Sequence, residues 1–188
     1  TAPTSGSAMR CKQGGTVEYR ICISPLIGSG VIFLNNLEIM EQEAADRGIE
    51  VIDYYFESNR IKALYKNGII AMNIRMRSYR QRACILAEEI AHHDTNVGNI
   101  LDQTDVSNRK QERRARLLAF DRLIGLRGLI RCFLAGDRNR YEVAERLEVT
   151  EEFLADALEM YRGKYGEGKQ VGNFWVSFEP YLSIVKIV

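Results

Sequence analysis

Two carboxylates and two imidazoles occur close together in this chain, at Glu88, Glu89, His92 and His93. Glu88 and His92 are four positions apart, so on a helix their side chains share one face. Helices present two ligands to a single zinc ion with this spacing, and Glu89 is then placed to reach a water on the metal without being a ligand. The pattern is H-E-x-x-H with Glu88 in place of the first His, which is chemically acceptable because zinc also binds carboxylate oxygen.

A zinc ion that catalyses a reaction takes three protein ligands and keeps one position open. The third ligand has to come from another element, and we predict Glu112, the single carboxylate in the run QERRAR. Asp94, Asp102 and Asp105 are alternative third ligands, and His93 is a candidate accessory group.

The string E-E-x-x-H is weak evidence by itself, because a solvated Glu pair near a His at a helix end is its commoner explanation. The surrounding sequence favours the metal: every residue from 83 to 91 other than Glu88 and Glu89 is apolar. A helix of this composition is mostly buried, and a buried carboxylate needs water, a cation or a metal to offset its desolvation.

The helices that must position these residues are indicated by periodicity and capping signals. Ser78 is a suitable N-cap for a helix over residues 79–93, and Ser107 or Asn108 for a helix over residues 109–124 that carries Glu112. Further helices are expected at residues 37–47, 126–135, 140–147 and 151–161, with Gly48, Gly136 and Gly163 as C-terminal stops.

Short runs rich in β-branched and aromatic residues indicate strands. We predict a three-stranded meander at residues 49–56, 61–65 and 69–73, whose last two strands are joined at the hairpin signal Asn67-Gly68. The tail, residues 173–188, is expected to form one or two strands that turn at Pro180.

The composition is that of a globular protein, with 46% apolar and 27% charged residues. The formal net charge of +1 gives no argument for binding nucleic acid or an anionic membrane. The apolar stretch at residues 21–34 is too short to span a bilayer and is interrupted by Pro and Gly. The four cysteines, Cys11, Cys22, Cys84 and Cys132, form no C-x-x-C pair, so we expect free thiols and a reducing cytoplasm.

The segment CILAEEIAHHDTNVGNI at residues 84–100, followed by NRKQERRARLLA at residues 108–119, resembles the ImmA/IrrE family of metallopeptidases from phages and other mobile elements. More narrowly, it resembles the branch that has E-E-x-x-H in place of H-E-x-x-H. The resemblance covers residues 37–166, because the active helix, the T-x-x-G segment and the E-x-x-A-x-x-x-A helix follow in the family's order and spacing.

This resemblance implies an α+β fold of the zincin type, in which a small twisted sheet lies beside the active-site helix. The sequence pattern itself predicts three strands for this sheet and a helical, helix-turn-helix-like region after the zincin-like core. The resemblance also implies a zinc ion with Glu88, His92 and Glu112 as ligands, and Glu89 as the general base. The implied activity is a site-limited cut in a helix-turn-helix transcriptional repressor, which derepresses mobile-element or stress genes.

We accordingly expect a zincin-like catalytic core at residues 37–125, a helical region at residues 126–166 and a C-terminal strand region at residues 167–188. Residues 10–36 are expected to be an N-terminal extension outside the resemblance, and residues 1–9 a cloning remnant with no part in function.

Two other functions are compatible with the sequence. Glu88 in place of His is compatible with a metallopeptidase fold that binds a partner and has lost its chemistry. Residues 141–161 also have the pattern of a DNA-reading helix-turn-helix. Their second helix, however, carries four carboxylates and no basic residue between positions 151 and 160, which opposes contact with phosphates. Direct binding of nucleic acid is therefore not expected, and the region is better explained as structural or as a dock for the repressor.

Overall fold

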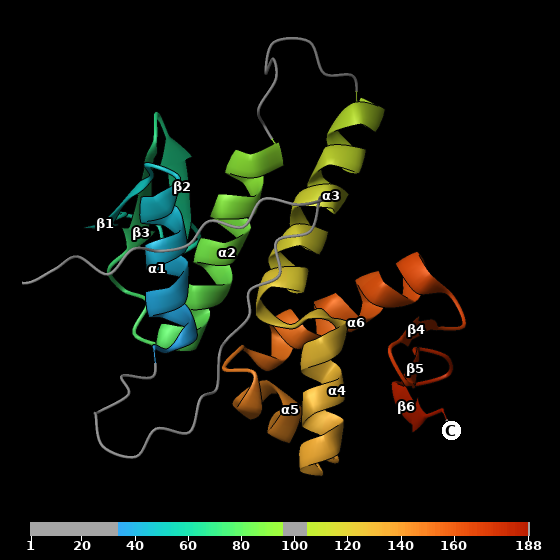
Figure 1. The fold of residues 1–188 in the computed structure, drawn as a ribbon. Coiled ribbons are helices and arrows are strands. Elements are labelled where there is room, and N and C mark those ends of the chain that lie inside the picture. The colour runs from blue at the N-terminus through green and yellow to red at the C-terminus, as the bar shows by residue number, and fades with distance from the viewer. Residues whose placement is uncertain (1–33, 96–104, 188) are drawn as a thin grey trace, which may run out of the picture. The chain divides into compact units, whose positions relative to one another are not determined.

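A computed structural model describes residues 34–95 and 105–187, except for the side chains of residues 105–108. Residues from Phe33 onward belong to one compact unit, and its fold class is α+β, as predicted (Figure 1). In chain order its elements are α1 (Asn36–Asp46), β1 (Glu50–Tyr54), β2 (Ala63–Lys66), β3 (Ile69–Asn73), α2 (Tyr79–Thr95), α3 (Asp105–Leu123), α4 (Gly125–Ala135), α5 (Arg140–Arg146), α6 (Glu151–Tyr165), β4 (Lys169–Val171), β5 (Phe174–Ser177) and β6 (Ser183–Lys186).

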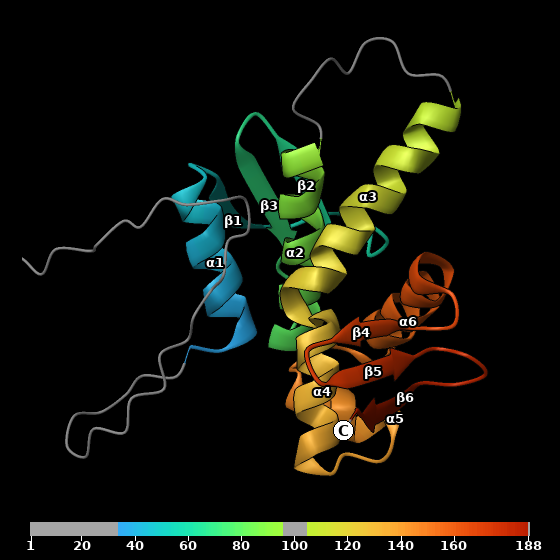
Figure 2. The same ribbon diagram turned by 45° about the vertical axis from the view of Figure 1, so that its right-hand side comes forward.

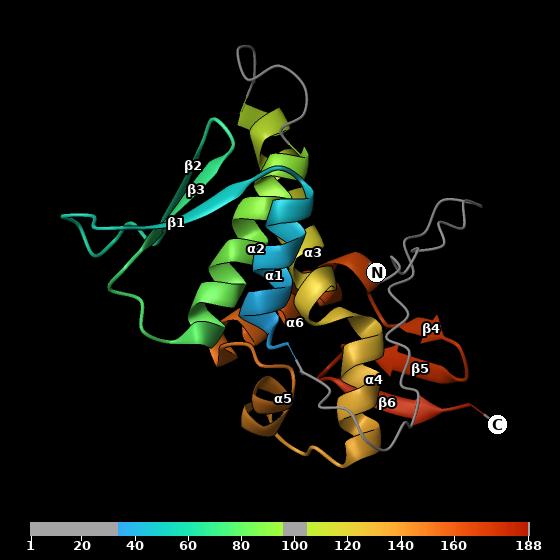
Figure 3. The same cartoon turned by 60° about the vertical axis from the view of Figure 1, so that its left-hand side comes forward.

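Helix α2 is the central element of the N-terminal half and lies between the first sheet and α3 (Figures 1 and 3). The predicted cap is confirmed, because the Ser78 hydroxyl accepts a hydrogen bond from the Gln81 N–H at 3.4 Å. The inward positions are fully buried, and several of them are Ala, such as Ala83, Ala87 and Ala91. Small side chains on this face let the neighbouring elements pack close to the α2 backbone.

The first sheet has three strands beside α2, as predicted, but it is not a meander. Its order is β1-β3-β2, with β1 parallel to β3 and β2 antiparallel to β3. The hairpin at Asn67-Gly68 is confirmed, and both residues have positive φ, at 51° and 81°. Strand β3 takes the centre because its side chains are the most apolar and the most buried of the three strands.

The connection over residues 55–62 makes this order possible, because it is long enough to carry the chain from one edge of the sheet to the other. Asn73, at the end of β3, fixes the position of that connection through two hydrogen bonds. Its side-chain amide donates to the Ile61 carbonyl at 2.7 Å, and its backbone N–H donates to the Lys62 carbonyl at 2.8 Å. Among the described residues Asn73 is the one buried polar side chain, and these bonds explain how its burial is tolerated.

Two helix boundaries differ from the prediction by four residues. Helix α3 begins at Asp105, so Ser107 and Asn108 lie inside the helix and neither is its N-cap. Helix α6 continues past Gly163 and ends at Tyr165, with Gly166 as its C-cap at a φ of 58°. A Cβ added at Gly163 would lie 3.0 Å from a guanidinium nitrogen of Arg113, so this glycine makes room for a side chain of α3 inside the helix.

The chain ends in a second sheet, an antiparallel meander of order β4-β5-β6 (Figure 2). Strands β5 and β6 flank Pro180, as predicted, while the short β4 was not expected. Its three residues carry too little β-branched or aromatic character to be recognised without the pairing to β5.

Cys84 and Cys132 are free and buried, in agreement with the prediction, whereas Cys11, Cys22 and the apolar residues 21–33 lie outside the described part of the chain. Burial raises the pKa of each described thiol to about 11, so neither is a reactive thiolate near neutral pH. Among the described helices, none combines the length and the hydropathy that a bilayer span requires.

Four charged side chains fasten α1, α2 and α3 to one another. Arg122 of α3 contacts Glu43 of α1 at 2.9 Å and also pairs with Asp94 of α2. Arg47, which follows α1, contacts the same two carboxylates at 2.8 Å and 3.0 Å. Each of the four side chains is at most 27% exposed, so water screens these pairs less than it would at the surface.

We predict that Arg122→Met will lower the free energy of unfolding by about 2 kcal/mol, because Glu43 and Asp94 then share a single partly buried partner. Urea unfolding followed by circular dichroism measures this loss. Arg114→Met on the exposed face of the same helix is the matched control, with an expected change under about 0.5 kcal/mol. Equal effects of the two substitutions would show that the cluster does not stabilise the fold.

Candidate metal centre

The four residues singled out on α2 all lie partly exposed on one side of the helix, while Ala87, Ile90 and Ala91 between them are fully buried. At 100° per residue, Glu88 and His92 lie along one strip of the helix and Glu89 and His93 along the next. Helix α3 lies on one flank of these strips, and strand β2 of the first sheet lies on the other.

His92 and Glu112 are brought together from two helices. The His92 Nε2 atom lies 3.6 Å from a carboxylate oxygen of Glu112. That distance exceeds a hydrogen bond, but it is close to the separation of about 3.4 Å between two ligand atoms of one tetrahedral zinc ion. Two of the three predicted ligands are therefore spaced as ligands of one ion.

Glu88 lines a pocket of about 300 Å³ between α2 and the start of α6. The opposite wall contains Thr150, which is the N-cap of α6, together with Phe153 and Asp156. Within residues 34–95 and 105–187, no hydrogen bond or ion pair of the Glu88 carboxylate is found. Arg116 of α3 is its cationic neighbour, but that guanidinium is already paired with Asp156 at 2.5 Å.

This setting makes Glu88 hard to ionise without a further cation. Burial raises the pKa of Glu88 to about 7, and the negative charges of Glu89, Glu112 and Asp156 raise it as well, while Arg116 opposes the shift. Burial also raises the pKa of Glu89, with Glu112 adding to the effect and His92 opposing it. The carboxylates of the cluster thus bring more negative charge than the neighbouring positive charge offsets. This imbalance favours the binding of a divalent cation.

His93 points to the first sheet. Its Nδ1 atom lies 2.9 Å from the hydroxyl oxygen of Tyr65 in β2, and the two rings meet edge to face with centroids 5.3 Å apart. His93 therefore fastens the edge strand β2 to α2 and is not grouped with His92 and Glu112.

The alternative ligands are placed differently. The Asp94 carboxylate is engaged by Arg47 and Arg122 in the cluster that joins the first three helices. Asp102 lies outside the described residues, and for Asp105 only the backbone at the start of α3 is described.

The donor types fit zinc, since one imidazole and two carboxylates are among its usual ligands. The convergence is incomplete, because no three His, Cys, Asp or Glu side chains within the described ranges meet closely enough to hold a metal ion. Two observations together support a cation at this place. His92 and Glu112 approach to 3.6 Å, and the neighbouring Glu88 carboxylate is desolvated without a partner among the described residues.

Sequence reasoning missed three neighbours of the centre. Tyr65 lies on the inward side of β2, and the alternation of the strand offers a weak signal for it. Arg116 lies in the basic run of α3, and nothing in the local sequence indicates that it pairs with Asp156. Thr150 caps α6, and its position opposite Glu88 depends on the docking of that helix.

Comparison with known families adds one match. The family model Peptidase_M78, described as an IrrE N-terminal-like domain, matches residues 44–159, which is more than half of the chain and includes all the candidate site residues. No curated protein matches the chain significantly, and no solved structure does.

The raised pKa of Glu88 predicts how metal-free protein responds to pH. Because the value is about 7 in the folded state and about 4.5 without burial, folding favours the protonated carboxyl. The stability that this contributes is complete below pH 4.5 and is lost as the pH rises through 7. In chelator-treated protein, Glu88→Gln should therefore exceed the wild type in unfolding free energy by about 2 kcal/mol at pH 8 and match it near pH 4.5.

Urea titrations at both pH values measure this difference. Glu152→Gln, at an exposed position on the same pocket, is the matched control for the loss of one carboxylate. A gap of the same size at pH 4.5 and pH 8 would contradict a burial-shifted Glu88.

Proposed function

We propose that this chain, which belongs to the IrrE N-terminal-like family of peptidases, is a zinc-dependent endopeptidase. The family indicates metallopeptidase-type function. The observation in the structure that best supports zinc is the approach of Glu112 to His92 beside the two desolvated carboxylates of α2.

In this proposal Glu88, His92 and Glu112 hold the metal ion. Zinc, when bound, supplies Lewis-acid activation of a water molecule and of a peptide carbonyl. Glu89 acts as the general base: its carboxylate takes a proton from the attacking water and then gives it to the leaving amide nitrogen. The burial that raises the pKa of Glu89 suits this role, because it moves the group toward the pH at which proton transfer in both directions is effective.

Strand β2 is well placed to hold an extended peptide. It is an edge strand of the first sheet and lies along α2, on the side of Glu89 and His93. An edge strand binds a peptide through backbone hydrogen bonds. Tyr65 projects from β2 and contacts His93, so we assign these two side chains an accessory role next to the bound peptide.

The substrate that we propose is a helix-turn-helix transcriptional repressor, and its limited cleavage derepresses mobile-element or stress genes. This substrate follows from the resemblance of residues 84–119 to the ImmA/IrrE metallopeptidases. Reading of DNA by α5 and α6 is not favoured, because the acidic side chains Glu151, Glu152, Asp156 and Glu159 all lie exposed on α6.

A second candidate is a partner-binding protein that keeps the peptidase fold without its chemistry. Two observations favour it: Glu88 stands where the usual motif has His, and within the described ranges the three donor groups do not meet at one point. Metal content and cleavage distinguish the two candidates.

The general-base role of Glu89 predicts that Glu89→Gln will keep zinc and lower the rate of repressor cleavage by about 10²-fold to 10⁴-fold, since Gln is nearly isosteric but accepts no proton. The measurement is zinc content together with cleavage of a co-expressed helix-turn-helix repressor, which is to be sought among the genes next to the one for this chain. Glu152→Gln is the control and should cleave normally. Retained cleavage in Glu89→Gln would exclude Glu89 as the base, and lost zinc would make it a ligand.

The ligand set predicts opposite effects of two substitutions on zinc itself. Glu88→His restores the usual motif and should bind zinc about tenfold more tightly, whereas His92→Ala should weaken binding by more than about 100-fold. Competition with a chromogenic zinc chelator measures both values without any substrate. Unchanged affinity in both variants would remove these side chains from the metal centre, whatever the fate of cleavage.

A further inference from the structure

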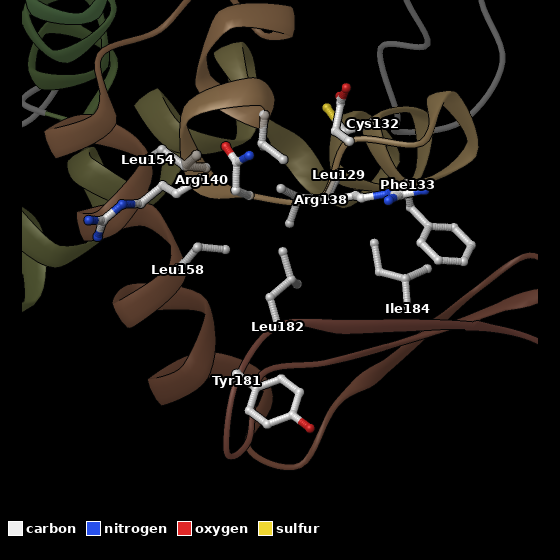
Figure 4. Close-up of a pocket in the computed structure, with 13 residues that line it drawn as sticks. Leu129, Cys132, Phe133, Arg138, Arg140, Leu154, Leu158, Tyr181, Leu182 and Ile184 are labelled. Atoms are coloured by element: carbon white, nitrogen blue, oxygen red, sulfur yellow. The ribbon is translucent and has the colours of Figure 1, made fainter.

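A second pocket, of about 280 Å³, lies among α4, α5, α6 and the C-terminal sheet (Figure 4). It shares no lining residue with the pocket at Glu88. Four apolar side chains point into the hollow: Leu129 of α4, Leu158 of α6, Leu182 just before β6 and Ile184 of β6. The lining residues come from three successive helices and from the C-terminal sheet, so the hollow is a product of how these elements pack.

The walls are apolar and not fully covered. Leu129 and Leu154 are buried, but Leu158, Leu182 and Ile184 remain partly exposed and Phe133 at the edge is 44% exposed. Apolar pockets with a few polar groups at the rim are the usual form of small-molecule sites. For comparison, an apolar cavity of about 150 Å³ is large enough to hold benzene.

The charge at the rim is positive. The Asp137 carboxylate is neutralised by two contacts with Arg146, at 2.5 Å and 3.0 Å. The guanidinium of Arg140 points away from the hollow in Figure 4 and lies 3.7 Å from Glu151. Arg138 differs, because its side chain extends along the hollow toward Phe133 and has no ion pair within residues 34–95 and 105–187.

We propose that this pocket binds a small carboxylic acid with an apolar tail. The tail lies among the leucines, and the carboxylate pairs with the guanidinium of Arg138. Arginine is suited to this task because its planar fork donates two parallel hydrogen bonds to a carboxylate. By comparison with the benzene-sized cavity, the volume fits a chain of about eight carbons or one ring with a short side chain.

The direct test titrates octanoate into the purified full-length chain by calorimetry and follows the methyl NMR signals of Leu158, Leu182 and Ile184. We expect saturable binding that moves these signals. Each methylene removed from the acid should weaken binding about fourfold. Octan-1-ol, which has the same chain length without the charge, should bind about fivefold more weakly than octanoate.

Two arginine variants isolate the charge. Arg138→Gln should reduce the affinity for octanoate to that for octan-1-ol and leave the alcohol unaffected. Arg140→Gln is the matched control: it removes an equal charge from the same rim, on a side chain that points outward, and should preserve the preference for the acid.

Leu182→Gln places an amide in the apolar wall and should weaken both probes alike. Because Leu182 is only partly buried and lies outside the helices, a fold defect can be recognised separately by thermal unfolding.

Several outcomes would overturn the proposal. These are the absence of saturable octanoate binding, equal binding of acid and alcohol, and equal loss in the Arg138 and Arg140 variants. Tighter binding of a peptide that ends in leucine than of octanoate would also overturn it, since the pocket would then serve a protein C-terminus.

Discussion

The desolvation of two adjacent carboxylates on a buried helix is the constraint on which the candidate site depends. Glu88 and Glu89 lie on the partly exposed side of α2, while Ala87, Ile90 and Ala91 next to them are fully buried. Carboxylates in such a place must be protonated or matched by positive charge. Arg116 supplies part of that charge, but its contact with Asp156 leaves the Glu88 carboxylate without a direct partner among the described residues. A divalent cation would supply the remainder.

The packing around α2 explains how the other groups reach these carboxylates. Small residues on the inward face let the sheet and α3 approach the helix closely, and the four-charge cluster of Arg47, Glu43, Asp94 and Arg122 fixes how α1, α2 and α3 meet. This arrangement places Glu112 next to His92, although 20 positions separate the two residues in the sequence. On the opposite flank, the contact between Tyr65 and His93 ties the edge strand β2 to the same helix.

Helix α6 contributes side chains to two pockets, one polar and one apolar. Its first turn, with Thr150 and Phe153, closes the polar pocket at Glu88, and Phe153 also packs on Phe120 of α3 with ring centroids 4.8 Å apart. The side chains of Leu154 and Leu158, one turn apart on another face, line the apolar pocket under the C-terminal sheet. The acidic side chains remain on the exposed face of the helix, where they oppose contact with phosphates.

The sequence by itself determined the elements whose signals are local. The Ser78 cap, the Asn67-Gly68 hairpin and the buried character of α2 follow from residue type and periodicity, and the order of motifs indicated the family that the matching family model confirms. Only the tertiary structure decided that β3 lies at the centre of the sheet and that α6 runs through Gly163. It also decided that Arg116 pairs with Asp156 and that Arg138 borders an apolar hollow. These features depend on contacts between residues far apart in the chain, where burial and charge pairing override local propensity.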